Sequence, residues 1–97
     1  MKVLALAHDL VDDDDARFAE LRPAEARMVW ELGQAEVLRE VYFRADHPSG
    51  VLVFEVPDVA AARAAIDRLP FVAAGLIDFE LIPLMPYPGF AQLFREA

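Results

Sequence analysis

The chain of 97 residues contains no cysteine, which excludes a disulfide scaffold, thiol catalysis and a thiolate metal site. It also has no apolar run of the roughly 18 residues that a membrane-spanning helix needs. The apolar part of the opening stretch MKVLALAHDL is too short for a signal peptide, and acidic residues follow it too early. We therefore expect a cytoplasmic protein. Cations are scarce, with nine Lys and Arg against seventeen Asp and Glu. Because nucleic acids and anionic membranes are bound by clustered cations, neither is an expected partner.

Apolar residues, in contrast, are abundant, and 57% of the chain is hydrophobic. A domain of this length buries roughly two-thirds of the surface that its unfolded chain exposes. Residues 1–97 are therefore expected to form one domain whose remaining apolar surface is covered by another molecule, most simply in a homodimer. Within it, residues 83–97 begin with several prolines and then become rich in aromatic residues. We expect them to form an extended C-terminal tail that docks on its own subunit or on a neighbour.

Four segments show the apolar alternation that is typical of β-strands. They are residues 2–9, 37–44, 51–57 and 76–84. A helix is expected to begin at Pro23, which suits a first helical turn, and the four aspartates at 12–15 are interpreted as a solvated loop. A second helix is expected after Asp58, its N-cap, and is expected to stop at Pro70. The order predicts an α+β fold, the ferredoxin-like βαββαβ sandwich, with a four-stranded antiparallel sheet and both helices on one face.

The segment LREVYFR, residues 38–44, is a predicted strand that carries charged residues. Alternation places Val41 and Phe43 on the helix-covered face of the sheet, and Tyr42 on the opposite face, here called the open face. Pairing the hydrophobic faces of the hairpin puts Tyr42 opposite Val53 and Glu40 opposite Glu55. The residues expected on the open face are Leu38, Glu40, Tyr42, Arg44, Val51, Val53, Glu55, Asp78, Glu80 and Ile82.

Two outcomes are possible for the open face. If it meets water, its acids are only solubilising groups. If two copies bring their open faces together, the ionisable groups line a semi-enclosed cavity. There, Glu40 and Glu55 would resist double ionisation. The pKa of one of them would be raised, so that a protonated carboxyl group lies beside an ionised one. The alternative for this pair is an ordinary cross-strand contact that Arg39 or Arg44 neutralises.

Three further side chains have both a functional and a structural interpretation. His8 is a candidate general acid or base near the end of the first strand, or a structural histidine, and alternation leaves its face of the sheet open. His47 is expected to be solvent-exposed in the hairpin turn. The two histidines lack the spacing of metal ligands, so no metal is proposed. Trp30 is interpreted as a core or interface residue, with the wall of a ligand site as the alternative.

The run LREVYFR, followed by VLVFEVPDVAAARAAIDRLPF and ending in LIPLMPYPGF, resembles the muconolactone isomerase-like group of small dimeric α/β barrels. The wider set also includes YciI-like proteins and cofactor-free monooxygenases. The resemblance covers residues 24–90. Its most specific part is the strand segment Val53, Phe54 and Glu55. This segment leads through Pro57 and Asp58 into a helix that ends in Leu69 and Pro70.

This resemblance implies a ferredoxin-like subunit, face-to-face sheet pairing in a homodimer, and a cavity that moves a proton in a small organic acid or lactone without a cofactor. By position, Arg39 and Arg44 match arginines that flank the second strand of such isomerases, and Glu55 matches the acid of the third strand. Arginine suits a carboxylate-bearing substrate through bidentate pairing. The expected catalytic residues are Glu40, Glu55 and His8, and the expected substrate-binding residues are Arg39, Tyr42, Arg44 and Trp30. The alternatives are a non-enzymatic dimerisation or ligand-sensing module and a cofactor-free monooxygenase.

Overall fold

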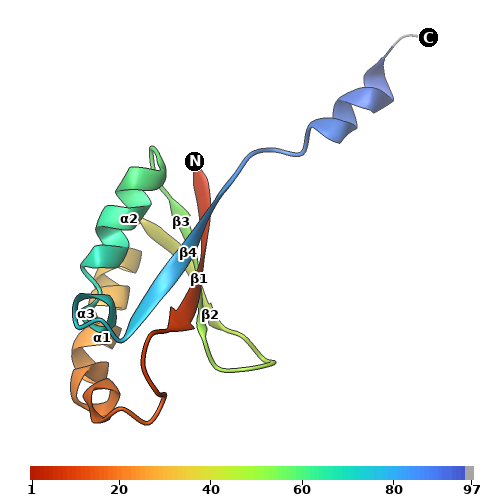
Figure 1. Ribbon diagram of the computed structural model, residues 1–97. Helices are drawn as coiled ribbons and strands as arrows, with labels where there is room; N and C mark the ends of the chain where they lie inside the picture. Colours follow the sequence, from red (N-terminus) through yellow and green to blue (C-terminus); the bar gives the residue numbers. More distant parts are fainter. Residues whose placement is uncertain (96–97) are drawn as a thin grey trace.

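The computed structural model describes residues 1–95, and four strands form one antiparallel sheet in the order β2-β3-β1-β4. The strands are β1 (Lys2–Asp9), β2 (Leu38–Phe43), β3 (Gly50–Glu55) and β4 (Ile77–Leu84). The helices are α1 (Ala16–Gln34), α2 (Val59–Asp67), the short α3 (Pro70–Ala73) and the 3₁₀ helix η1 (Pro88–Phe94). Figure 1 shows α1 and α2 on the same face of the sheet. The predicted ferredoxin-like α+β fold is thereby confirmed.

The core lies between the sheet and the two long helices. Val3, Leu52 and Phe54 point from the sheet into this layer and are buried. From the helices, Leu32 of α1 and Ile66 of α2 are buried against them. The spacing of three or four residues predicts a buried stripe of Val59, Ala62, Ile66 and Leu69 in the second helix. The structure confirms it, because Ala62, Ile66 and Leu69 are buried and Val59 packs against the core.

Helix α1 begins at Ala16, so the predicted start at Pro23 is wrong. The carboxylate of Asp15 caps the helix, because its Oδ1 accepts a hydrogen bond from the backbone N–H of Arg17 at 3.0 Å. The Arg17 side chain binds the same carboxylate, and this hydrogen bond lowers the pKa of Asp15 to about 2. The last of the four aspartates is thus a capping residue, whereas the first three are exposed. Pro23 is tolerated inside the helix at the cost of one backbone hydrogen bond.

The pairing of β2 with β3 differs from the predicted register by two residues, and it contains a β-bulge. Tyr42 pairs with Val51 instead of Val53, and Glu40 pairs with Val53 instead of Glu55. The register shifts between Leu38 and Glu40, so that one extra residue is inserted. As a result Leu38 pairs with Phe54 and is buried on the helix-covered face, which corrects its predicted position on the open face.

The remaining connections also depart from the prediction in one place. Pro70 does stop α2. The sequence predicts only a short turn over residues 71–75, whereas the structure forms the short helix α3 there, with Pro70 in its first turn. Gly75 then adopts φ +74°, a left-handed conformation that glycine accepts without a steric penalty. This turn leads into β4, in which alternation predicts Ile77 and Phe79 on the helix-covered face, opposite to Asp78 and Glu80. Ile77 and Phe79 are both buried there, as predicted.

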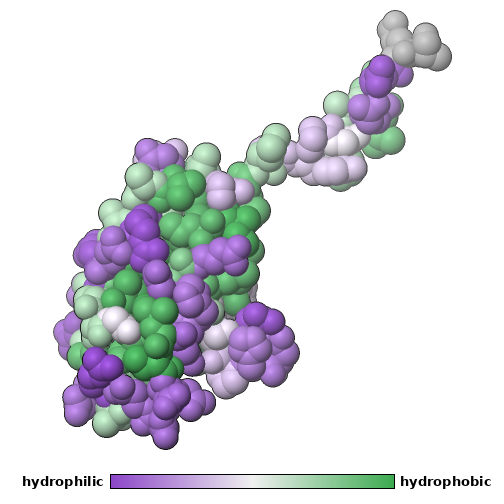
Figure 2. All heavy atoms as spheres, viewed as in Figure 1, coloured by the Kyte–Doolittle hydropathy of each residue, from purple (hydrophilic) through white to green (hydrophobic). Residues whose placement is uncertain are grey.

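Beyond β4 the chain leaves the body of the molecule. Figure 1 shows this segment pointing away from the sheet and helices, and Figure 2 shows hydrophobic atoms exposed along it. We call residues 85–95 the tail. The last two residues of the expected C-terminal tail, 96–97, lie outside the described residues. The molecule is consequently elongated, with principal extents of 63 × 29 × 19 Å.

Replacing Asp58 by alanine is expected to lower the free energy of unfolding by about 0.5–2 kcal/mol. The Asp58 Oδ1 accepts a hydrogen bond from the backbone N–H of Ala61 at 2.9 Å, and alanine leaves that N–H of the first turn of α2 without this acceptor. Urea denaturation measures the loss. Asp13→Ala is the matched control, because Asp13 is an exposed loop aspartate outside any helix. An equal loss in both variants would contradict the capping role.

Candidate functional site

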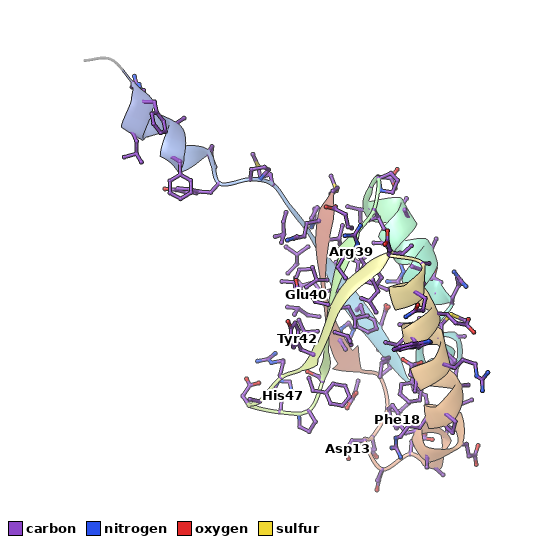
Figure 3. All side chains as sticks on the ribbon, turned by 180° about the vertical axis from the view of Figure 1, so that it is seen from behind. Asp13, Phe18, Arg39, Glu40, Tyr42 and His47 are labelled. Carbon is purple, nitrogen blue, oxygen red and sulfur yellow. The ribbon has the colours of Figure 1, made fainter. Side chains whose placement is uncertain are left out.

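A groove of about 670 Å³ lies between α1 and β2 on the helix-covered side of the sheet. It exists because α1 covers β2 only in part, so that Val41 and Phe43 are exposed although their side chains are on the helix side. Figure 3 views the molecule from behind, with β2 in front and α1 beside it. Apolar side chains dominate the lining, which consists of Ala7, Ala26, Val29, Trp30, Leu38, Val41, Phe43, Leu52, Leu69, Phe71 and Ile77, together with Arg22, Glu25, Gly33, Gln34, Arg39, Glu40 and Gly50.

Glu25 is the half-buried acid of this groove, whereas Glu40, which also lines it, is exposed. The Oε1 of Glu25 accepts a hydrogen bond from the backbone N–H of Phe71 at 3.0 Å, and no other hydrogen bond or ion pair reaches its carboxyl group from residues 1–95. Burial raises the pKa of Glu25, and the hydrogen bond from Phe71 lowers it by less. A half-buried carboxyl group of this kind exchanges a proton more readily near neutral pH than an exposed glutamate does.

Sequence reasoning missed Glu25, although a signal for it exists. Arg22, Glu25, Val29 and Gly33 recur every three or four residues, which places them on one face of α1. The helix expected from Pro23 was assigned an apolar side of Leu21, Met28, Leu32 and Ala35, and that side lies next to this face. With the start at Ala16, the same spacing shows an arginine and a glutamate one turn apart on a helix that borders the sheet edge.

Three of the expected substrate-binding and catalytic residues lie at the groove: Trp30, Arg39 and Glu40. Trp30 is 68% exposed, so it belongs to the wall of the groove and not to the core. The Nε of Arg39, the residue at the bulge, donates to the backbone oxygen of Glu36 at 2.6 Å. No ion pair within residues 1–95 holds the guanidinium group of Arg39 or that of Arg22. Both are therefore free to bind an anion at the edge of the groove.

The proposed carboxylate pair of Glu40 and Glu55 is wrong. The two residues are not opposite each other in the sheet, because Glu40 faces Val53. Glu55 binds the N-terminal ammonium group at 2.9 Å, and this hydrogen bond lowers the pKa of Glu55, which is the reverse of the expected rise. Glu40 accepts a hydrogen bond from the Tyr42 hydroxyl at 2.8 Å, which raises the pKa of Tyr42. Figure 3 shows Glu40 and Tyr42 on the side of β2 away from the helices.

The remaining expected residues lie around a smaller hollow on the open face. Its volume is about 340 Å³, and its lining includes His8, Arg44, His47 and Glu80. His8 pairs with Asp78 in β4, so the His8 side chain lies on the open face. The Arg44 guanidinium donates two hydrogen bonds to Asp46, at 2.9 and 2.6 Å, and thereby lowers the pKa of Asp46 to about 2. Arg44 is therefore engaged within the hairpin and does not converge with Arg39.

His47 is exposed in the hairpin, as predicted. Within residues 1–95, no three or more side chains of the His, Asp and Glu type gather as a metal site would require. None of the helices in the same range combines the length and apolarity needed to cross a membrane.

Comparisons with known proteins agree with this architecture. No protein-family model matches the chain, and no curated protein matches it. Among solved structures, the chain is similar to muconolactone isomerase, with 27% identity, a TM-score of 0.74, and coverage of 91% of this chain and 92% of that one. It is also similar to 5-chloro-2-hydroxyhydroquinone dehydrochlorinase from Burkholderia phenoliruptrix AC1100, in complex with 2,5-dihydroxybenzoquinone. That likeness has 14% identity, a TM-score of 0.66, and coverage of 88% and 94%, and it concerns the fold alone.

The similarity to muconolactone isomerase extends over almost the whole chain and confirms the resemblance that the sequence shows. This chain has the muconolactone isomerase-like fold.

Proposed function

We propose that this protein binds a small organic acid or lactone in the groove between α1 and β2 and moves a proton on it without a cofactor. The half-buried Glu25 in a predominantly apolar groove carries this proposal. Small-molecule sites have volumes of about 300–1,000 Å³ and combine apolar walls with a few polar groups. The groove fits both criteria.

The proposed chemistry needs one group that accepts a proton and returns it. Ionised Glu25 removes a proton from a C–H bond next to a carbonyl group, and protonated Glu25 then gives that proton to another carbon of the same molecule. The substrate is isomerised and Glu25 is regenerated. The similarity to muconolactone isomerase supports an isomerisation of this class.

Arg39 and Arg22 are the proposed anchors for a substrate carboxylate. Both line the groove, on opposite walls, from β2 and α1. A guanidinium group binds a carboxylate through two parallel hydrogen bonds, which fixes the orientation of the substrate as well as its position. Trp30 supplies a flat apolar wall, and Glu40 lies where the groove meets the open face.

The open face is the proposed dimer interface, as the fold resemblance implies. Its apolar residues are only half-buried in the single chain: Leu4, Leu6, Val51, Val53 and Ile82. Pairing of two open faces would remove this surface from water at about 25 cal/mol per Å² of apolar area. His8, Tyr42, Arg44 and Glu55 would then surround a second, composite cavity, which is the alternative site for a ligand.

A screen of small carboxylic acids and lactones by thermal shift tests the proposal and separates the two sites. We expect a binding acid to lose roughly tenfold or more in affinity in Arg39→Gln, because a charge-assisted hydrogen bond contributes about 1.5–3 kcal/mol. Arg27→Gln, on an exposed part of α1, is the control and is expected to bind normally. Loss of binding in Arg44→Gln with normal binding in Arg39→Gln would move the site to the open face. An acid that binds but never exchanges its C–H protons would favour a ligand-sensing module.

A further inference from the structure

Two of the four glycines of the chain have no local reason to be glycine, and both line the groove. Gly33 lies in α1, and glycine is less favourable in a helix than any residue except proline. Gly50 is the first residue of β3, where glycine loses more conformational freedom than other residues do. Neither has the positive φ that glycine adopts easily. By contrast, Gly75 has φ +74°, and a Cβ at Gly89 would overlap the Tyr87 ring.

Packing does not require glycine at these two positions either. Beyond its chain neighbours and the backbone of its own helix, a Cβ at Gly33 would meet no atom closer than the backbone oxygen of Leu38 at 4.0 Å. A Cβ at Gly50 would make ordinary contacts with Ala7 at 3.7 Å and with the Phe79 ring at 3.9 Å. Alanine fits at both positions. The effect of glycine there is to leave part of the groove empty, and this space is available to a ligand.

The empty space lies beside two aromatic rings that have no stacking partner. Gly33 follows Trp30 by three residues, so the two share one side of α1, and no side chain at Gly33 covers the indole ring. Gly50 pairs with Phe43 in the sheet, so the Phe43 ring also lacks a cross-strand side chain beside it. Within residues 1–95, neither ring stacks on another aromatic side chain. Each glycine therefore leaves the ring next to it uncovered, one on α1 and one on β2.

The rest of the lining fits a ligand with one acidic group on an apolar body. Arg22 and Arg39 have no ion pair within residues 1–95, and Figure 3 shows Arg39 near the beginning of β2. Apolar side chains make up most of the remaining lining. The volume of about 670 Å³ lies within the range of about 300–1,000 Å³ of sites that bury drug-sized ligands. Two fused rings fill such a space better than a single small ring does.

From these observations we propose that the groove takes a carboxylic acid built on a flat, fused-ring aromatic body, and that Gly33 and Gly50 determine this specificity. The rings lie in the space that the two glycines leave, against Trp30 and Phe43, and the carboxylate binds Arg39. Aromatic pairs of this kind add to the free energy gained from burying apolar area. The inference rests on the proposed function because it uses the same groove and the same anchor, but it does not depend on the proton transfer.

Three acids separate flatness from size, with titration calorimetry on the intact protein as the measurement. Naphthoic acid has two flat fused rings, decahydronaphthoic acid has the same carbon skeleton without flat rings, and benzoic acid has one flat ring. We expect naphthoic acid to bind roughly tenfold or more tightly than either of the others, because only it can contact both aromatic rings with its full width. Equal affinities for naphthoic and decahydronaphthoic acid would overturn the proposal.

Substitution of the two glycines tests their role directly. Gly33→Leu and Gly50→Val fill the space and are each expected to weaken the binding of naphthoic acid by roughly tenfold or more, and that of benzoic acid by less than about threefold. Ala24→Leu, an equally large side chain on an exposed part of α1 outside the groove, is the control and should bind as the wild type. Normal binding of naphthoic acid in both glycine variants would overturn the proposal.

Gly33→Ala guards against a loss of binding that comes from misfolding. Alanine is the best helix former, so this variant is expected to melt no lower than the wild type. Its single added methyl group should nevertheless weaken the binding of naphthoic acid, by less than Gly33→Leu does. A Gly33→Ala protein that melts normally and binds naphthoic acid as tightly as the wild type would show that the space at this position is not used.

This inference and the proposed function fail in different ways. If naphthoic acid binds through Arg39 and the glycine variants lose it, while no acid in the screen exchanges its C–H protons, the inference stands and the proton transfer is wrong. If a single-ring acid binds through Arg39 and naphthoic acid does not, the inference is wrong and the groove is still the ligand site. If no acid binds in the groove, both are wrong.

Discussion

Phe54→Ala is expected to lower the free energy of unfolding by about 3–5 kcal/mol, which is a large share of the roughly 5–15 kcal/mol that stabilises a small domain. Phe54 is completely buried in the middle of the sheet, between Val3 of β1 and Leu38 of β2. The substitution removes the transfer free energy of the ring and also leaves a cavity beneath the helices. For a domain of this size each kcal/mol lowers the melting temperature by about 4–8 °C, so calorimetry and urea denaturation should both detect the loss.

Phe43→Ala is the matched control, because it makes the same change in the neighbouring strand. Phe43 is 77% exposed, and little apolar surface is removed from water when the single chain folds. Its expected cost is below about 1 kcal/mol at protein concentrations where chains do not associate. If the two variants lost similar stability, the assignment of Phe54 to the core and of Phe43 to the mouth of the groove would be wrong.

Glu25→Gln is expected to slow the proposed proton transfer by about 10²–10⁴-fold, the usual contribution of a positioned general acid or base. Glutamine keeps an oxygen that can accept the hydrogen bond from the Phe71 N–H, so the contact between α1 and α3 is preserved. The measurement is the exchange of C–H protons for deuterium, followed by NMR, on an acid found in the binding screen. Glu31→Gln, an exposed change on the same helix, should leave the exchange rate unchanged. Equal rates in Glu25→Gln and wild type would remove Glu25 from the chemistry.

The raised pKa of Glu25 also gives a pH dependence with a definite sign. Burial disfavours the ionised form, so the folded-state pKa lies above that of the unfolded chain. The stability associated with neutral Glu25 is therefore fully present below the unfolded pKa and is lost as the pH rises through the folded pKa. In Glu25→Gln this loss is absent, so the variant should gain stability relative to wild type as the pH rises through that window. Proton abstraction by wild type should increase over the same window.

The fold could be predicted well where a pattern depends on neighbouring residues. The alternation in β1 and the stripe of α2 follow directly from the sequence, and the structure confirms both. The start of α1 was missed because Pro23 and Asp15 are both good N-terminal signals, and only tertiary packing selects between them. The register of the hairpin was missed because a slip of two residues keeps Glu40 to Phe43 on their predicted faces, so alternation alone does not distinguish the two pairings. The bulge before Glu40 then places Leu38 on the helix-covered face.

The candidate site was harder to predict than the fold. Arg39, Glu40 and Trp30 were expected at a ligand site and do line the groove, whereas His8, Tyr42, Arg44 and Glu55 lie on the other face of the sheet. The functional roles of all seven stay predictions. The groove itself results from incomplete coverage of an edge strand by α1. This depends on how a helix is placed over a sheet, which no local spacing reveals.

The extra residue at Arg39 has a consequence for comparing this chain with others. It reverses the alternation of side chains along β2. Leu38, before it, points to the helix-covered face, whereas Glu40 and Tyr42, after it, point to the open face. A related protein without the insertion needs a one-residue gap at this point. An alignment that omits the gap would equate a core leucine with a solvent-facing residue and would transfer site assignments to the wrong side of the strand.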